Sequence, residues 1–281
     1  MNKRVKQELK KLLNYFVFFN YVPTLKEVWL FYPKKLNLEK LTEMIKKNKL
    51  IIEKNRVFEK NQRLLLHETL KRKKISQTKI SKRQEFIKRL GKLPWVQFIG
   101  ISGTVSMLNA DVKDDLDLFI ITKNKRLWTA RFWLVAITSL LGVRRKPHDQ
   151  SFQDKLCLNL LFSEANLKIP SNKQNQYIGH EILQLLPVVN KNQAYEKLLK
   201  VNKWVGELFP NSEKKVKSYK LKFKSTNQSS KVLETIGNRI EGILKRIQLT
   251  LIARHKTNEI ITDTQLWFFP QDFEKKLAKY L

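Results

Sequence analysis

Two aspartates, Asp115 and Asp117, stand two residues apart where an apolar, β-branched and aromatic run begins. Such a run predicts a β-strand, and because side chains alternate along a strand, both carboxylates are expected on one face of the sheet. Two carboxylates on one face can share a pair of divalent metal ions, as nucleotide chemistry requires. The alternative is an aspartate-rich turn before an ordinary strand, but Asp117 would then be a charge inside an apolar run, which is costly unless a cation is present.

A glycine turn precedes the two aspartates. Gly103-Thr104 follows the apolar run 95–101, so the sequence predicts a strand that turns into a helix at this point. Glycine allows backbone N–H groups to approach a phosphate closely, and the start of the following helix favours an anion. Ser102, Gly103 and Thr104 are therefore candidate nucleotide-binding residues.

The order of these motifs resembles the polymerase-β-like nucleotidyltransferase superfamily. In that family a glycine–hydroxyl turn is followed by about ten residues and then by Asp-x-Asp on the next strand; here Gly103-Thr104 and Asp115-Leu116-Asp117 take these places, and the resemblance covers roughly residues 96–162. It implies an enzyme that transfers a nucleoside monophosphate from an NTP to an acceptor hydroxyl and releases pyrophosphate. It also implies that catalytic Asp115 and Asp117 hold two Mg²⁺ ions, while Gly103 and Thr104 hold the β and γ phosphates.

The family usually has a third carboxylate on a later strand, and this sequence departs from that pattern. The polar side chain near the middle of the matching strand is Asn159, which can coordinate a cation through its oxygen but carries no charge. Asp154 and Glu164 flank the strand, and Glu181 can reach in from the helical region that follows. Asn159 is the predicted third metal ligand, with these three carboxylates as alternatives.

Basic side chains near the second strand are candidates for neutralising the triphosphate. Arg131 is favoured because a charge within an apolar helix needs a partner, although an internal salt bridge serves equally well. Lys123, Lys125, Arg126 and the loop Arg144-Arg145-Lys146 are the other candidates. The sequence does not choose among them.

The overall charge of the chain is strongly positive. Its 281 residues carry 56 Lys and Arg against 25 Asp and Glu, a formal net charge of +31. Residues 1–90 alone hold 25 Lys and Arg, 8 Glu and no Asp. A charge of this size attracts polyanions, so RNA or DNA is the expected macromolecular partner. The alternative is a solvated basic surface without a partner.

The cysteine content and the apolar segments of the sequence bear on the cellular compartment of the protein. There is one cysteine, Cys157, which makes no intrachain disulfide and is expected to be a small core residue. The N-terminus shows no secretory signal, and the longest apolar stretch, 127–143, is short for a membrane span and contains Arg131. We therefore expect a cytoplasmic protein without membrane contact, of undetermined oligomeric state.

The secondary-structure pattern predicts an α+β protein with a small mixed sheet. A winged-helix-like module is expected over residues 1–62, a basic helical linker over 63–92, the nucleotidyltransferase palm over 93–168 and a helical C-terminal domain over 169–281. Thr24 and Glu27 have the spacing of a capping box at the second helix. An alternative is that the N-terminal helices only pack on the next domain.

Three functions remain open. The leading hypothesis is a Mg²⁺-dependent nucleotidyltransferase acting on RNA or another macromolecule. The others are a non-catalytic, nucleotide-sensing regulator that binds nucleic acid and a small-molecule nucleotidyltransferase of the antibiotic-modifying kind. The candidate nucleic-acid contacts are Lys46, Lys47, Lys71, Arg72, Lys73, Lys74, Arg144 and Arg145.

Overall fold

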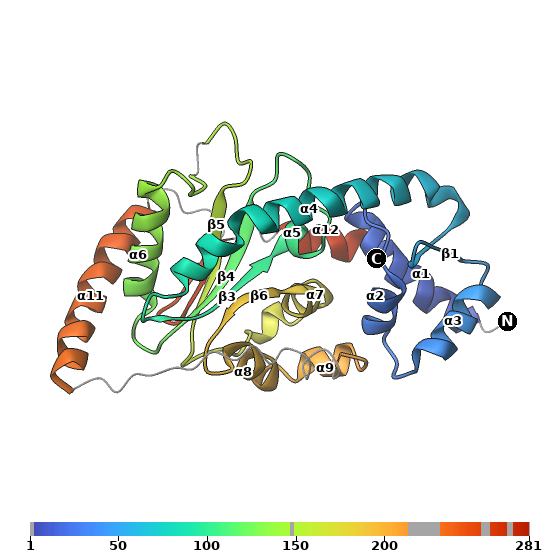
Figure 1. The fold of residues 1–281 in the computed structure, drawn as a ribbon. Coiled ribbons are helices and arrows are strands. Elements are labelled where there is room, and N and C mark those ends of the chain that lie inside the picture. Colours follow the sequence, from blue (N-terminus) through green and yellow to red (C-terminus); the bar gives the residue numbers. More distant parts are fainter. Residues whose placement is uncertain (1–2, 147–148, 213–230, 254–258, 269–271, 281) are drawn as a thin grey trace.

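The computed structural model describes residues 3–146, 149–212, 231–253, 259–268 and 272–280. The molecule is elongated, with a mixed β-sheet in its middle, the N-terminal helices at one end and the pair α6 and α11 at the other (Figure 1). It is an α+β structure, as the sequence predicts. None of the described helices combines the length and apolar character needed to cross a membrane.

The N-terminal elements are three helices, a hairpin and a long helix. Their bounds are α1 Lys3–Phe18, α2 Leu25–Leu30, α3 Leu38–Lys47, β1 Ile51–Glu53, β2 Arg56–Phe58, the 3₁₀ turn η1 Lys60–Gln62 and α4 Arg63–Leu90. The predicted capping box is confirmed, because the Thr24 side chain accepts from the Glu27 N–H while the Glu27 side chain accepts from the Thr24 N–H. The order of three helices and a hairpin agrees with the prediction; a winged-helix function remains a hypothesis.

The central elements carry the motifs found in the sequence. They are β3 Val96–Ser102, α5 Gly103–Ser106, β4 Leu116–Thr122, α6 Leu127–Leu140, β5 Leu156–Ser163, η2 Ser171–Lys173, α7 Gln176–Gln184, β6 Leu186–Asn190, α8 Ala194–Val201, α9 Trp204–Leu208, α11 Lys231–Ala253, β7 Ile260–Ile261, β8 Gln265–Trp267 and α12 Asp272–Tyr280. The three strands predicted for the palm region are confirmed as β3, β4 and β5.

The sheet has six strands in the order β6-β3-β4-β5-β8-β7. Strands β4 and β5 run parallel and are connected through α6, whereas all other neighbours are antiparallel. The expectation of helices alone after Pro170 is wrong, because β6, β7 and β8 join the sheet. These strands have two to five residues, and apolar runs this short do not reveal their type by periodicity. Their pairing decides it: β6 pairs with β3, β8 with β5 and β7 with β8.

The two faces of the sheet pack against different helices. On one face Phe98, Phe119 and Trp267 share a core with α1, α2, α7 and α8. On the other face Leu118 and Ile120 share a core with α4, α6 and α11. Because alternate residues of β4 face opposite ways, Asp117 lies on the same face as Phe119.

Helix α4 is tied to the loops around the aspartates by one buried lysine. Lys79 is 3% exposed, and its ammonium donates to the Val112 and Asp114 carbonyls and to the Asp154 carboxylate, at 2.7, 2.8 and 2.9 Å. Burial acts to raise the pKa of Asp154, but hydrogen bonds from Lys82 and Lys79 outweigh it and lower that pKa. Part of the basic segment predicted to be a linker therefore fixes the loop that leads into β4.

Candidate active site

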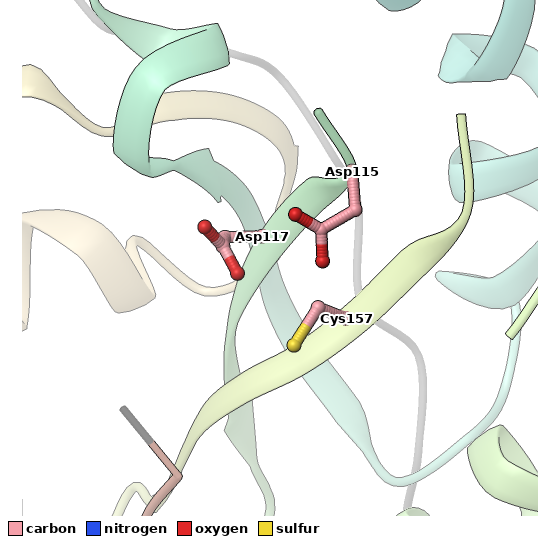
Figure 2. A group of neighbouring side chains, drawn as sticks. All are labelled: Asp115, Asp117 and Cys157. Carbon is pink, nitrogen blue, oxygen red and sulfur yellow. The ribbon is translucent and has the colours of Figure 1, made fainter. Parts of the chain in front are cut away.

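Asp115, Asp117 and Cys157 form one cluster at the ends of two neighbouring strands. Asp117 and Cys157 are register partners in the parallel pair β4–β5, and Asp115 directly precedes β4. The ligating atoms of the three side chains all lie within 4.8 Å of one another, and Figure 2 shows them turned toward a common space. The prediction that both aspartates serve one site is consistent with this geometry.

The expectation that Cys157 is a core residue is wrong. The residue is partly exposed, and its thiol donates to the Asp117 carboxylate. The register between the two strands is interrupted next to Asn159, since Leu118 pairs with Leu158 and Phe119 with Leu160. Asn159 therefore has no partner in β4, and Cys157 is the β5 side chain beside Asp117. The sequence of β5 did not reveal that Cys157 lies beside Asp117, because this depends on the register of β5 against β4.

The glycine turn touches the same carboxylate. Gly103 has a φ of +65°, and a Cβ at this position would lie 2.7 Å from Asp117 Oδ2. Both the left-handed backbone and the close approach require glycine. The turn and Asp117 thus occupy one small volume, as the sequence motif predicts.

Gly103→Ala is expected to disturb this turn. The added methyl group must displace the Asp117 carboxylate and adopt a strained φ, so the free energy of unfolding should fall by about 1–3 kcal/mol. Chemical denaturation with near-ultraviolet circular dichroism measures this loss. Gly142→Ala is the matched control, because Gly142 also has a φ of +65° but its Cβ meets no atom within 4 Å. Equal losses in the two variants would contradict a specific contact with Asp117.

Glu181 is the carboxylate that approaches the turn from the helical side. It lies on α7, and the Gly103 N–H donates a hydrogen bond to it; burial raises the pKa of Glu181 to about 7 against this bond. Asp154 is instead held by Lys79, and Glu164 accepts from the Asn124 N–H beyond the far end of β4. Of the three alternatives for a third carboxylate, the structure brings Glu181 to the site.

The N-terminal helices hold α7 in place. The His180 ring, fully buried, stacks between Tyr15 and Phe31 with centroid distances of 3.7 Å to each. Because His180 directly precedes Glu181, this stack fixes the helical turn that carries the carboxylate. The N-terminal module therefore packs on the sheet domain and positions a site residue.

The charges within the cluster repel one another in the absence of a cation. Burial raises the pKa of Asp117 to about 7, and the Asp115 and Glu181 carboxylates add to the shift. Asp115 is paired with Arg145 at 2.8 Å, and the Arg145 guanidinium also lies 4.3 Å from the centre of the Phe152 ring. A divalent cation between the aspartates would relieve the repulsion that Arg145 relieves only at Asp115.

The hydroxyl groups of the turn have different surroundings. The Thr104 hydroxyl donates to Asp114 Oδ2 at 3.0 Å, which ties the turn to the loop before β4. Ser102 is 2% exposed, and its Oγ finds no hydrogen-bond partner among the described residues. Ser102 also lines a cavity of about 10 Å³ together with Phe119 and Glu181. Gly103 and Ser102 thus border the cluster directly, and Thr104 supports it from the loop side.

The structure does not bring Arg126 and Arg131 to the carboxylates. The Arg131 guanidinium bonds to Gln248 of α11 at 2.6 Å, and burial lowers its pKa to about 10. Arg126 bonds to Asn238 of the same helix. Helices α6 and α11 cover the sheet face opposite Asp117. The partner that Arg131 needs is therefore Gln248, in the contact between these two helices, and not a substrate phosphate. Arg145, from the loop after α6, is the arginine that reaches the site.

The remaining basic candidates are spread over two helices and one loop. Lys46 and Lys47 are exposed at the end of α3, and Lys71 and Lys74 are exposed on α4. Lys73 is partly exposed, Arg72 bonds to the Asn20 carbonyl, and Arg144 bonds to Ser139. Four of the five lysines therefore present their charge to solvent, and Arg145 is the member of this set that forms an ion pair with Asp115.

Comparison of the chain with protein-family models, with curated proteins and with solved structures finds no match. The activity of the site is therefore inferred from its own geometry and chemistry.

Proposed function

We propose that this chain is a divalent-metal-dependent nucleotidyltransferase that transfers a nucleoside monophosphate from an NTP to an acceptor hydroxyl. The observation that carries the proposal is the meeting of the Gly103 turn with Asp115 and Asp117. A turn that binds phosphate and a carboxylate pair that binds a cation can act on one triphosphate only when they lie side by side.

The donor set fits a divalent cation, since it offers two carboxylates and a thiol, and Arg145 forms an ion pair with Asp115 but not with Asp117. Such a cation, when bound, supplies charge neutralisation of the triphosphate and lowers the pKa of the acceptor hydroxyl. The two aspartates would hold it, beside the turn at Gly103.

The chain's own residues supply the remaining steps. The acceptor oxygen attacks the α-phosphorus, the bond to the β-phosphate breaks, and pyrophosphate leaves. Glu181, with a pKa of about 7, is suited to accept the proton of the acceptor hydroxyl. Arg145 would exchange its bond to Asp115 for the triphosphate.

The acceptor is proposed to be RNA or another polyanionic macromolecule. The formal net charge of +31 and the exposed lysines of α3 and α4, among them Lys47 and Lys71, support this choice. Association with a polyanion should weaken steeply with salt, because bound lysines displace counterions.

The test is pyrophosphate release from each NTP, with Mg²⁺ or Mn²⁺ as the cation, with and without bulk cellular RNA. We expect release that RNA stimulates in the wild type and that Asp117→Asn lacks. Asp263→Asn is the matched control, because Asp263 is 79% exposed between β7 and β8, at the edge of the sheet. Release that requires a small hydroxyl compound instead of RNA would indicate the small-molecule class.

Arg145→Gln is expected to raise the KM for the NTP about tenfold with a smaller change in kcat, because one charged contact to the triphosphate is lost. Steady-state kinetics at saturating cation measure both constants. Lys146→Gln serves as the control, since Lys146 is the exposed neighbour in the same loop. An unchanged KM would show that Arg145 forms its ion pair with Asp115 but does not contact the triphosphate.

A nucleotide-sensing regulator is the second candidate. It is favoured by one observation: β5 presents a thiol, and no carboxylate, beside Asp117. This function predicts saturable NTP binding without pyrophosphate release, and NTP-dependent binding to RNA or DNA.

A further inference from the structure

Cys157 belongs to a group of three side chains that could hold a metal ion. It stands opposite Asp117 in the register of β4 and β5, and its Sγ lies within 4.8 Å of carboxylate oxygens of both aspartates (Figure 2). The chain has one cysteine, so this is the only thiol in the sequence.

A second observation indicates a polar ligand beside this cluster. Ser102 is the register partner of Asp117 in the antiparallel pair β3–β4, so the two side chains are neighbours on one face. The Ser102 Oγ is buried and has no hydrogen-bond partner among the described residues. A buried hydroxyl left unpaired is costly. Ser102, Asp117 and Cys157 thus form a polar row across three strands inside an otherwise apolar face.

The donor chemistry distinguishes between cations. Mg²⁺ prefers oxygen ligands in an octahedral arrangement, whereas thiolates select softer metals such as zinc. Zinc accepts cysteine sulfur and carboxylate oxygen as ligands, and its catalytic sites have three protein ligands with a fourth position left for water or substrate. A carboxylate in place of Cys157 would suit Mg²⁺, but the chain has a thiol there.

We propose that Asp115, Asp117 and Cys157 bind a thiophilic divalent cation of the zinc class in preference to Mg²⁺, with Cys157 as a thiolate ligand. On binding, the sulfur–metal bond forms and the thiol proton passes to solvent. The inference deepens the proposed function, since it names the cation of the same site, but its test requires no turnover.

The experiment titrates Co²⁺ and Cd²⁺ into chelator-treated full-length protein and records the near-ultraviolet absorption. A thiolate-to-metal charge-transfer band is expected to saturate at one equivalent. Because Cys157 is the only cysteine, such a band can come from no other residue. Zn²⁺ should abolish the band by displacement at stoichiometric concentration, and a large excess of Mg²⁺ should not.

Two variants sharpen the result. Cys157→Ser should lack the band and lose the rise in melting temperature that Zn²⁺ gives the wild type. Cys157→Asp should reverse the preference, so that Mg²⁺ then raises the melting temperature. The absence of a band in the wild type at saturating Co²⁺ and Cd²⁺ overturns the proposal, as does equal stabilisation of the wild type by Mg²⁺ and Zn²⁺. The wild-type titration is decisive even where a variant fails to fold.

The two proposals fail separately. If the charge-transfer band is seen but no cation supports pyrophosphate release, the thiophilic metal site is supported and the nucleotidyltransferase proposal is rejected. If RNA stimulates pyrophosphate release but no charge-transfer band is seen, the nucleotidyltransferase is supported and Cys157 is rejected as a metal ligand.

Discussion

Asp117→Asn is expected to abolish nucleotidyl transfer and to make the metal-free protein more stable. Loss of one of the two metal-binding carboxylates should lower turnover by at least about a thousandfold, since the charge of the triphosphate is then no longer balanced at the reacting centre. The same substitution removes a carboxylate that burial and Asp115 disfavour. Activity and stability should therefore change in opposite directions.

The gain in stability should depend on pH in a defined way. The pKa of Asp117 is about 7 in the folded protein against 3.8 for the ordinary group, so between these values the folded state binds more protons than the unfolded state. Stability of the wild type consequently falls as pH rises through this window. The Asp117→Asn variant lacks this fall and should gain on the order of 2 kcal/mol near pH 8, and nothing below pH of about 4.

Urea denaturation in the presence of a chelator, at several pH values, measures the difference between the two proteins. Asp263→Asn is again the control, because its exposed carboxylate gains nothing from neutralisation. A variant that is less stable than the wild type at high pH would show that the Asp117 carboxylate is stabilised by the protein without a cation. A variant that retains turnover would contradict the assignment of the site.

Lys79→Met is expected to cost about 3–5 kcal/mol of unfolding free energy. The substitution leaves the buried Asp154 carboxylate without its closest buried cation and leaves the Val112 and Asp114 carbonyls without their donor. Because Asp114 directly precedes Asp115, the metal site should loosen as well. Chemical denaturation measures the first effect, and the affinity for Co²⁺ measures the second.

Two further variants test the cause. Lys74→Met on the exposed side of the same helix should change stability by less than about 0.5 kcal/mol. The double variant Lys79→Met with Asp154→Asn should recover part of the loss, because the buried carboxylate charge is then removed together with the buried ammonium. Asparagine also tolerates the positive φ of 57° at this position. A double variant as unstable as the single one would show that the carbonyl contacts, and not the ion pair, carry the effect.

The sequence by itself determined the elements that hold the site. Continuous apolar, β-branched and aromatic runs placed β3, β4 and β5, the capping box at Thr24 placed α2, and the Gly103 turn with Asp115 and Asp117 located the candidate chemistry. These features depend on neighbours within a few residues, so local patterns are sufficient to find them.

Only the tertiary structure decided which other residues belong to the site. Cys157 replaced Asn159 because the register of β5 against β4 selects the side chain beside Asp117. Glu181 lies on α7, far along the chain from the aspartates, and only the packing of that helix brings it to the Gly103 turn. Arg145, and not Arg131, contacts Asp115, because Arg131 lies in the contact between α6 and α11 on the opposite face of the sheet. The same packing buries Lys79 and bonds it to the loop that leads into β4. Register, sheet face and helix packing each relate residues that are distant in sequence, and no local pattern encodes them.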